Sequence, residues 1–414
     1  MVIFHIDANS AYLSWEAVRR LEAGESLDLR TVPSVVGGDP RKRSGIVLTK
    51  SIPAKRFGIQ TGETLWEARS KCPDLIIVPP DYDLYLRCSD AMYDILRRYS
   101  SRVQRYSVDE CFLDYTHSQQ ALGDPLEAAR DIKERIFREL GFTVNVGVSV
   151  NKLLAKMASE LQKPDRLHSL FPEEIPEKMW PLPVEELFMV GRATTRKLHR
   201  INVRTIGQLA AMDPVRLEGM FKSHGRLIHR YANGLDASRV LENAVLAPKS
   251  VGNSTTTAWD LTETREARLV LLALTERVAM RLRRARCLCS VVTVSVRNSA
   301  LCRYSHQRVL DTPTDVTGEL FSAVTDLFDQ CWQLDPIRHL GVRLSGLEGN
   351  DFVQLSLLDD PDRLSRQRLD AAVDQLRQRY GDGALIRGCF VQSGVRPVLG
   401  GVNDGDYPMM TSLL

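Results

Sequence analysis

Hydrophobic residues recur with two different periods along residues 1–165. Short apolar runs that end at turn residues predict strands, and apolar positions three or four residues apart predict helices. The predicted strands cover residues 2–7, 75–78, 103–106, 111–114 and 143–149. The predicted helices cover residues 11–21, 62–71, 82–99, 126–140 and 152–161. The elements at 2–7, 82–99, 103–106, 111–114, 126–140 and 143–149 follow the β-α-β-β-α-β order of a ferredoxin-like unit, with residues 11–74 inserted after its first strand.

The spacing of hydrophobic residues along the chain changes after Pro164. Residues 171–240 are predicted to form short helices joined by basic turns. Residues 250–347 combine predicted strands at 291–297, 303–309 and 340–344 with predicted helices at 266–286 and 315–332. A hinge is expected at residues 348–351, before a final amphipathic helix at 364–380. The whole pattern predicts an α+β multidomain protein, as a length of 414 residues also indicates.

Composition excludes several classes of protein. The chain is 43% hydrophobic and 26% charged, which is typical of a folded protein rather than a disordered one. No apolar run approaches the about 18 residues that a membrane span requires, and the first residues lack the features of a signal peptide. The net charge of +3 neither requires nor excludes a nucleic-acid partner. The eight cysteines include no CxxC pair, so we expect reduced thiols in the cytoplasm.

Three acidic residues stand at strand ends that a ferredoxin-like sheet would bring together. Asp7 ends the first predicted strand, and Asp109 and Glu110 lie at the turn between two later strands. Two-metal phosphoryl transfer needs such carboxylates, and Mg²⁺ prefers hard oxygen ligands. The carbonyl group of Ala8 could add a backbone ligand. Each motif alone also fits a solvated turn, so the flanking sequence has to decide between the two interpretations.

The flanking sequence resembles the Y-family DNA polymerases of the bacterial DNA polymerase IV kind along residues 1–350. The matching segments are Asp7-Ala8-Asn9-Ser10-Ala11-Tyr12, Tyr106-Ser107-Val108-Asp109-Glu110-Cys111-Phe112-Leu113-Asp114, and residues 146–159, VGVSVNKLLAKMAS. The resemblance implies a low-fidelity, translesion DNA polymerase that transfers nucleotides with two Mg²⁺ ions. It makes Asp7, Asp109 and Glu110 the metal-binding carboxylates, with Ala8 beside them.

The resemblance also implies a right-handed polymerase architecture. It comprises a ferredoxin-like palm (1–10 and 75–165), small fingers (11–74), a helical thumb with a helix-hairpin-helix (166–240), an α+β little finger (250–347) and a C-terminal extension (348–414). No segment is left over for a proofreading exonuclease. The expected partners are primer-template DNA and dNTP, and the protein is expected to be a monomer with no membrane contact.

Four residues are expected to handle the nucleotide. By resemblance, Tyr12 packs under the sugar and rejects ribonucleotides, and Lys163 reaches the triphosphate. Thr49 and Lys55 lie in the segment where the family places a tyrosine and an arginine on the triphosphate. The chain departs from the family there, because Ile52 replaces the tyrosine and Lys55 replaces the arginine, which removes the bidentate fork.

Two segments are expected to bind the DNA backbone. Residues 184–209 resemble a helix-hairpin-helix, in which Gly191 and Arg192 would meet a phosphate at a helix N-terminus. In the second turn Asn202 stands in place of glycine and tolerates the left-handed conformation. The predicted little finger is rich in arginine, at positions 281, 283, 284, 286, 297, 303 and 308. Of these, Arg297 and Arg303 are the predicted DNA contacts.

A short apolar peptide after the predicted hinge resembles the bacterial sliding-clamp-binding motif. It consists of Gln354, Leu355, Ser356, Leu357 and Leu358. Packing of this peptide against the final helix is the alternative. Three other functions stay open: a catalytically impaired Y-family scaffold that binds DNA and the clamp, which Ile52 would favour; a nucleotidyl cyclase; and a plain DNA-binding module. The last two leave the clamp peptide or the carboxylates unexplained.

Overall fold

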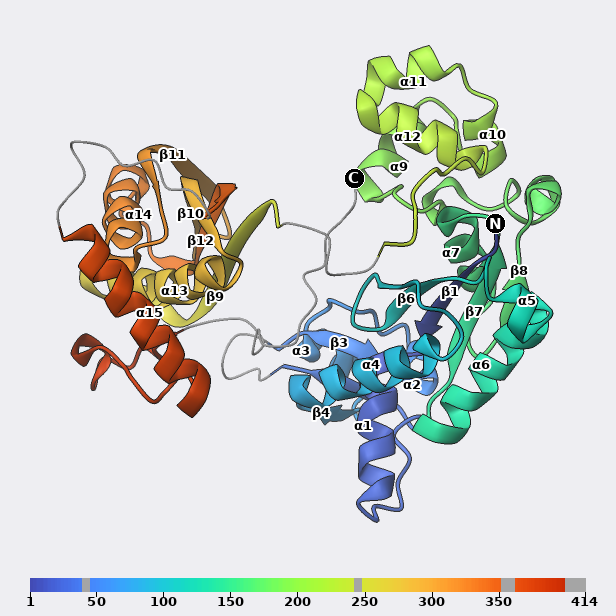
Figure 1. Ribbon diagram of the computed structural model, residues 1–414, viewed down its shortest axis with the longest axis horizontal. Helices are drawn as coiled ribbons and strands as arrows, with labels where there is room; N and C mark the ends of the chain where they lie inside the picture. Colours follow the sequence, from blue (N-terminus) through green and yellow to red (C-terminus); the bar gives the residue numbers. More distant parts are fainter. Residues whose placement is uncertain (39–44, 242–247, 351–361, 399–414) are drawn as a thin grey trace. The chain divides into compact units, whose positions relative to one another are not determined.

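The computed structural model describes residues 1–38, 45–241, 248–350 and 362–398 (Figure 1). Two compact units are distinguished by their internal contacts. The first contains the described residues up to 241, apart from Gly45, and the second contains those from 248 onward.

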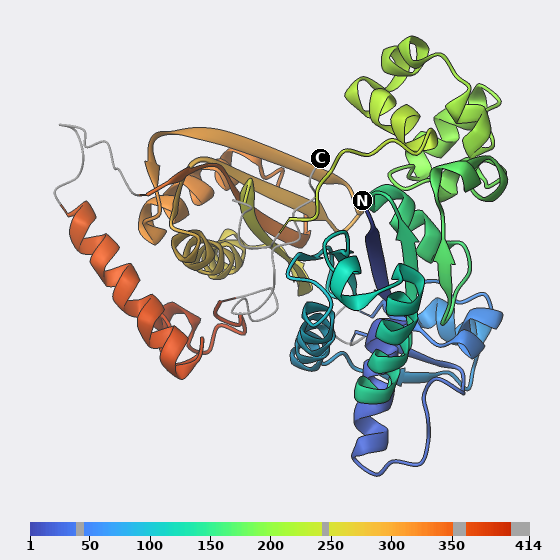
Figure 2. The same cartoon turned by 45° about the vertical axis from the view of Figure 1, so that its right-hand side comes forward.

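The first unit is built on a five-stranded sheet, here called the main sheet. Its strands, in spatial order, are β5 (Val103–Arg105), β6 (Glu110–Asp114), β1 (Ile3–Ala8), β7 (Val144–Ser149) and β8 (Leu167–Ser169). β1 is the central strand, dark blue in Figures 1 and 2, and it is antiparallel to both β6 and β7. This strand order confirms the predicted ferredoxin-like fold. β8 adds a fifth strand, parallel to β7, inside the range expected for the thumb.

Helices cover the main sheet. They are α4 (Tyr82–Arg97), α6 (Pro125–Leu140) and α7 (Lys152–Glu160), while the short α5 (Gln119–Leu122) has no buried residue. The helix α7 lies on the side of the sheet to which His5 points, because the His5 ring contacts Ser159 of α7. It packs so tightly on β7 that a Cβ atom at Gly147 would lie 2.0 Å from the Ala155 carbonyl oxygen. Glycine at this position therefore sets the depth at which α7 sits.

A second, smaller sheet contains β3 (Val47–Lys50), β2 (Ser34–Gly37) and β4 (Ile76–Val78) in that order. Its helices are α1 (Ala11–Glu22), α2 (Ile52–Arg56) and α3 (Leu65–Lys71). The expected hairpin-like pairing is present, since β2 and β3 are antiparallel. β4 pairs with β2 in parallel, so residues 76–78 belong to this sheet, although residue 75 was the expected start of the palm.

Residues 172–232 form a helical segment whose core is shared with α7, through residues such as Leu154 and Met157. Its elements are η2 (Pro172–Glu174), α8 (Ile175–Lys178), η3 (Val184–Glu186), α9 (Arg192–Arg200), α10 (Ile206–Ala210), α11 (Pro214–Phe221) and α12 (Ser223–Ala232). Leu198 of α9 and Ile206 of α10 are fully buried in this core. Asn202, between those two helices, has a φ of 62°, which is the left-handed conformation expected there.

The second unit contains an antiparallel sheet of four strands. Their order is β11 (Arg303–Thr314), β10 (Cys287–Asn298), β12 (Ile337–Gly349) and β9 (Ser250–Leu261). The helices α13 (Thr264–Arg284) and α14 (Thr317–Cys331) pack on one face. β9 was not predicted, because this edge strand carries mostly small polar residues. The expected hinge was also wrong at its start, since Glu348 and Gly349 still pair with β10.

The last helix of the second unit is α15 (Arg363–Tyr380), followed by the short η5 (Gly388–Phe390). The guanidinium group of Arg283 on α13 donates two hydrogen bonds, of 2.7 and 2.9 Å, to Asp374 on α15. Glu276 on α13 likewise forms salt bridges with Arg377 of α15 and with Arg387. Figure 1 shows α15, in red, beside α13. Arg283 is thereby removed from the arginine-rich surface that the sequence suggested.

In the described part of the chain, the helices are all too short or too polar to span a bilayer.

Candidate active site

The three predicted carboxylate residues lie together at one end of the main sheet. Asp7 on β1 is directly opposite Glu110 on β6 in the strand register. The backbone of Asp109 is held beside the end of β1, because its carbonyl oxygen accepts a hydrogen bond of 2.9 Å from the Ala8 amide. Pairing of two central strands therefore brings together residues that are about a hundred positions apart in the sequence.

Asp7 is buried and bonded to a lysine. The Lys163 ammonium group donates a hydrogen bond to Asp7 Oδ2 and a second one, of 2.9 Å, to Glu160 Oε1. Burial raises the pKa of Asp7 to about 7, and the charge of Lys163 opposes this shift only in part. The carboxylate is thus costly to ionise unless a cation accompanies it.

Glu110 is held in its ionised form by two neighbours. Lys156 Nζ on α7 donates a hydrogen bond of 2.8 Å to Glu110 Oε2, and His5 Nε2 lies 3.4 Å from the same oxygen. Burial tends to raise the pKa of Glu110, but the contacts with His5 and Lys156 outweigh it and lower the pKa to about 2. His5 is fully buried, and burial lowers its own pKa to about 4.

Asp109 differs from the other two carboxylates in its surroundings. The Ser107 hydroxyl donates a hydrogen bond of 2.5 Å to its Oδ1. Burial raises the pKa of Asp109, and the nearby charge of Glu110 adds to this effect. Among the described residues, the carboxylates close enough to share one ion are Asp7, Glu110 and Glu160, whose oxygens lie within 4.8 Å of one another. Asp109 is outside this set.

The chemistry of the donor groups fits hard divalent cations. The site offers carboxylate oxygens on a rigid sheet, which Mg²⁺ prefers. Burial raises the pKa values of Asp7 and Asp109, so a bound cation would stabilise the ionised form of both carboxyl groups. The Lys163 ammonium group, bonded to Asp7, stands where a cation would be expected.

Tyr12 lies in an aromatic stack at the start of α1. Its ring is parallel to that of Tyr85 on α4, with centroids 4.2 Å apart and an interplanar angle of 8°. Tyr85 is itself buried and donates a hydrogen bond of 3.0 Å to Glu16. The plane of Tyr12 is therefore set by a partner that is fixed at its far end. Tyr85 was not among the residues predicted for the nucleotide site.

The other two nucleotide candidates lie on the smaller sheet and its helix. Thr49 is in β3 and Lys55 is in α2, where the Lys55 side chain is exposed. Ile52, at the start of the same helix, is 42% exposed and offers no hydrogen-bonding group. The Lys50 side chain is partly buried, and burial together with the charge of Lys55 lowers its pKa.

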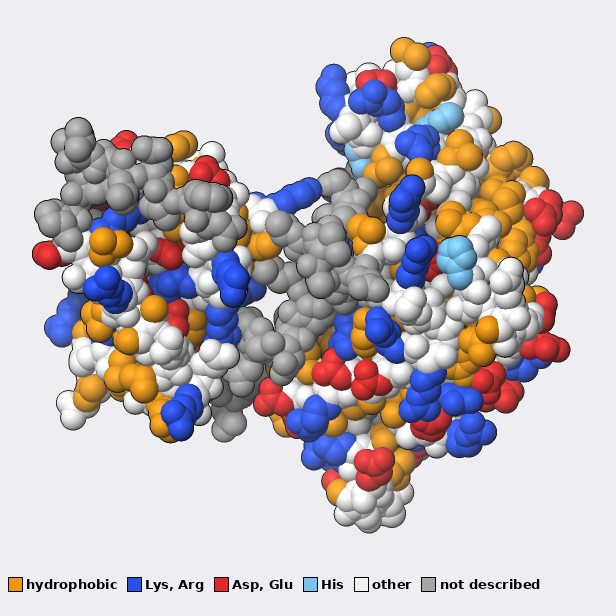
Figure 3. Space-filling view, viewed as in Figure 1, with side chains coloured by type: hydrophobic (Ala, Val, Ile, Leu, Met, Phe, Trp, Pro, Cys, Tyr) orange, Lys and Arg blue, Asp and Glu red, His pale blue; other side chains and the backbone are white. Residues whose placement is uncertain are grey.

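The helical segment presents a basic face. Gly191 is the N-cap of α9 and Arg192 is its first residue, and both are exposed. Figure 3 shows Lys and Arg side chains over α9, α11 and α12. A helix N-terminus surrounded by basic side chains favours a phosphate group.

In the second unit, strand register separates the predicted arginines. Arg297 and Arg303 are cross-strand partners on the sheet face away from the helices, and His339 is the partner of Arg297 on β12. Burial, followed by the charges of these two arginines, lowers the pKa of His339. Arg308 is opposite Val292, which is buried under the helices, and it pairs with Asp326 of α14 at 3.7 Å. Arg308 is therefore on the wrong face for the predicted surface.

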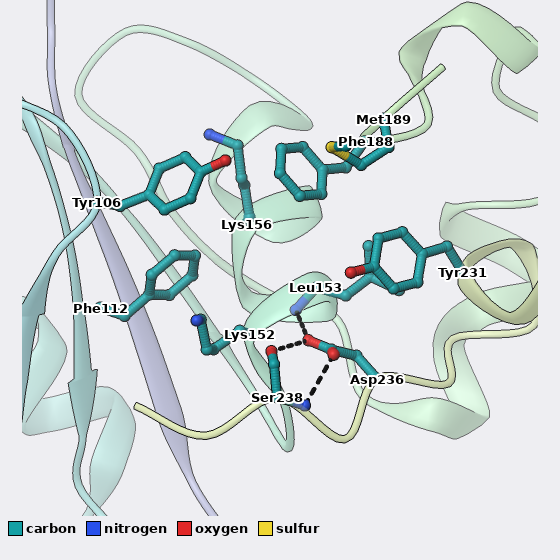
Figure 4. A pocket seen from close by; sticks show the side chains of 10 residues that line it. All are labelled: Tyr106, Phe112, Lys152, Leu153, Lys156, Phe188, Met189, Tyr231, Asp236 and Ser238. Atoms are coloured by element: carbon teal, nitrogen blue, oxygen red, sulfur yellow. Dashed lines mark hydrogen bonds between the residues drawn. The ribbon is translucent and has the colours of Figure 1, made fainter. Parts of the chain in front are cut away.

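A pocket lies beside Glu110 in the first unit (Figure 4). Lys152 and Lys156 reach it from α7, and the rings of Tyr106 and Phe188 face the Lys156 ammonium group at 5.6 Å. On its other side, the Asp236 carboxylate accepts a hydrogen bond of 3.2 Å from the Leu153 amide. Both ammonium groups already have protein partners, because Lys156 is paired with Glu110 and Lys152 donates a hydrogen bond of 3.1 Å to Gln104.

Sequence reasoning missed His5, Lys156 and Glu160. His5 lies two residues before Asp7 on one strand, so both side chains point to the same face. Lys156 and Glu160 lie one helical turn apart on α7, within or just after the longest matching segment. Strand and helix periodicity could have assigned all three to the site. The predicted clamp-binding residues 354–358 lie outside the described residues.

Comparisons with known proteins agree with this arrangement. The model of the impB/mucB/samB family matches residues 6–160, and that of its C-terminal domain matches residues 248–357. A protein named DNA polymerase IV from Clostridium acetobutylicum is 45% identical over 391 residues, which is 94% of this chain and 98% of that protein. DNA polymerase IV 2 of Bacillus subtilis is 36% identical, with 93% of both chains covered.

Solved structures share the fold. A Y-family DNA polymerase chimera superposes with a TM-score of 0.72 at 21% identity, covering 84% of this chain and 100% of that one. An insertion ternary complex of the Dbh DNA polymerase gives a TM-score of 0.59 at 20% identity, with the same coverage. The chain therefore belongs to the impB/mucB/samB family of Y-family DNA polymerases, in the group of the DNA polymerase IV proteins.

Proposed function

We propose that the chain is a template-directed, low-fidelity DNA polymerase that performs translesion synthesis. It transfers a nucleotide from a dNTP to a primer 3′ end. The observation that carries this proposal is the pairing of β1 with β6, which sets Asp7 opposite Glu110 and bonds Ala8 to Asp109. A carboxylate set of this kind on a rigid sheet edge is what nucleotidyl transfer requires.

The proposed cofactor is a pair of Mg²⁺ ions held by Asp7, Asp109 and Glu110, with the Ala8 carbonyl as a backbone ligand. Bound there, the ions would activate the attacking oxygen and clamp the triphosphate. The protein's own part is positioning. Lys156 fixes the Glu110 carboxylate at 2.8 Å, and Ser107 fixes that of Asp109 at 2.5 Å.

We assign the incoming nucleotide to the space between the carboxylates and the smaller sheet. Lys163 is the best-placed cation for the triphosphate, since it already lies beside Asp7. Lys55 and Thr49 would add contacts from α2 and β3, and the Tyr12 ring would close the pocket under the sugar. The exposed Ile52 leaves this side with fewer hydrogen-bond donors than the family pattern has.

Primer-template DNA is the proposed partner of the basic surfaces on both units. Gly191 and Arg192 would meet one phosphate at the start of α9, while Arg297 and Arg303 would meet others on the open face of the second sheet. Residues beside these arginines on that face, such as Ser295 and Ser305, are small and polar, so a duplex backbone can approach closely.

The proposed DNA contacts of Arg297 and Arg303 predict how the salt dependence of DNA binding changes when both are removed. Changing Arg297 and Arg303 together to alanine should lower the slope of log affinity against log salt by about 2, because each phosphate contact contributes about 0.9. Fluorescence anisotropy with labelled primer-template at several salt concentrations measures this slope. Arg308→Ala is the matched control, since Arg308 lies on the opposite face of the same sheet. An equal loss in the control would contradict the assignment.

We also propose a protein partner, the sliding clamp, and a location in the cell. Residues 354–358 would tether the polymerase to the sliding clamp, and the protein would act as a monomer on DNA in the cytoplasm. The impaired-scaffold alternative is not favoured, because Asp7, Asp109 and Glu110 are all retained.

Primer extension tests the function. Wild-type protein with Mg²⁺ should extend a primer on an undamaged template and past an abasic site, and chelation of the metal by EDTA should stop both reactions. DNA binding without any incorporation of nucleotide would instead support the scaffold.

A further inference from the structure

The contacts of Lys163 raise a problem that the proposed function must solve. Its ammonium group donates a hydrogen bond to Asp7, the carboxylate that a divalent ion needs. A divalent ion on Asp7 would repel this ammonium group and would compete for the same oxygen. Lys163 therefore has to leave Asp7 when the ion binds, yet it has to stay in the site to meet a triphosphate.

Glu160 offers the means to keep it there. Its Oε1 accepts a hydrogen bond of 2.9 Å from Lys163, independently of Asp7. Glu160 ends α7, and its side chain is 43% exposed, so it can follow a moving partner at little cost. Its carboxylate oxygen lies within 4.8 Å of those of Asp7 and Glu110, so the Lys163 ammonium group can bond Glu160 and Asp7 at the same time and keep Glu160 when it leaves Asp7.

The backbone of this segment is fixed, which confines the movement to side chains. Asn145, directly opposite Asp7 on β7, is fully buried. Its amide nitrogen donates hydrogen bonds to the carbonyl oxygens of Ser159 and Gln162, and its side-chain oxygen accepts one from the Arg166 amide. The chain on both sides of Lys163 is thus attached to the main sheet.

We propose that Lys163 is a stand-in cation for Asp7 in the metal-free enzyme, and that Glu160 is the positioning residue that retains it. When metal and nucleotide bind, the Lys163 ammonium group moves from Asp7 to the triphosphate while it stays tied to Glu160. This inference rests on the proposed metal-dependent polymerase function. It assigns Glu160 to Lys163 and not to the metal.

The test uses two measurements on the full chain. Affinity for Mn²⁺ without nucleotide or DNA is measured from the electron paramagnetic resonance signal of the free ion. Affinity for dATP opposite a templating T is measured by single-turnover primer extension with saturating metal. Lys163→Met should bind Mn²⁺ about tenfold more tightly, because a charge-assisted hydrogen bond no longer competes with the ion. Lys133→Met, which removes a lysine paired with Asp165 on the surface, should not.

Glu160→Gln should leave Mn²⁺ affinity within about twofold of wild type and weaken dATP binding by about tenfold. In the Lys163→Met background the same change should have no further effect on dATP binding. Glu139→Gln, which breaks an exposed ion pair with Arg98, is the matched control and should change neither quantity.

Three results would overturn the proposal. Unchanged Mn²⁺ affinity in Lys163→Met would remove the stand-in role. Weaker Mn²⁺ binding by Glu160→Gln in both backgrounds would make Glu160 a metal ligand instead. Weaker dATP binding by Glu160→Gln without Lys163 would show that it acts on the nucleotide directly. The Mn²⁺ titration needs no turnover, so it is read even if the chain fails to extend primers.

Discussion

Replacing Asp109 with asparagine is expected to lower the rate of nucleotide incorporation by at least about 10³-fold. The change removes a proposed metal ligand and one negative charge while it preserves the shape of the side chain. The metal-free variant should at the same time be at least as stable as wild type. Burial raises the pKa of Asp109, so the folded state disfavours the ionised carboxylate. The stability of the wild-type protein therefore falls as the pH rises and Asp109 loses its proton.

Asparagine cannot ionise, so the variant loses this penalty, and its advantage in the midpoint of thermal unfolding should grow with pH. Single-turnover primer extension and thermal unfolding in EDTA measure the two effects. Asp74→Asn, at an exposed position before β4, should change neither. A variant that is both inactive and clearly less stable than wild type would indicate that Asp109 has a structural role.

Replacing Tyr12 with alanine is expected to reduce discrimination between dNTP and rNTP by at least about 10²-fold, with a much smaller effect on dNTP incorporation. The ring is held parallel to Tyr85 at 4.2 Å, so it cannot turn aside for a 2′-hydroxyl without breaking the stack. The ratio of kcat/KM values for the two nucleotides on one template measures discrimination.

Tyr12→Phe is the matched variant, because it keeps the ring and its stack on Tyr85. It should retain most of the discrimination if the ring acts by excluding the hydroxyl sterically. Unchanged discrimination in Tyr12→Ala would contradict the role of this residue. Equal losses in both variants would assign the effect to the phenolic oxygen.

The fold was accessible from the sequence where periodicity and motif agreed. The strands that carry Asp7 and Glu110 are short apolar runs bounded by turns, and the β-α-β-β-α-β order then dictated which of them pair. β9 was missed because it carries polar residues on both faces: Thr255 is opposite the buried Leu340 on the side covered by the helices, and Ser254 points to the other side. Residues 75–78 were assigned to the palm, whereas residues 76–78 pair with β2 of the smaller sheet, because a short apolar strand does not specify its partner.

The site was predictable only in part. Asp7, Asp109 and Glu110 were found through their motifs, whereas the contacts of Lys156 and Glu160 depend on how deeply α7 packs on β7. Arg303 and Arg308 can be assigned to opposite faces of the sheet from their spacing alone, because residues five apart on a strand point to opposite faces. The pairing of Arg283 with Asp374 joins residues from distant helices, and no local pattern could reveal it.

The central claim is that Asp7, Asp109 and Glu110 together hold two metal ions. Anomalous diffraction from Mn²⁺ tests it most directly, in crystals of the protein with a dideoxy-terminated primer, template and matching dNTP. We predict two peaks about 3.5–4 Å apart, with Asp109 among the ligands. A single peak held by Asp7, Glu110 and Glu160, with Asp109 still bonded only to Ser107, would contradict the account.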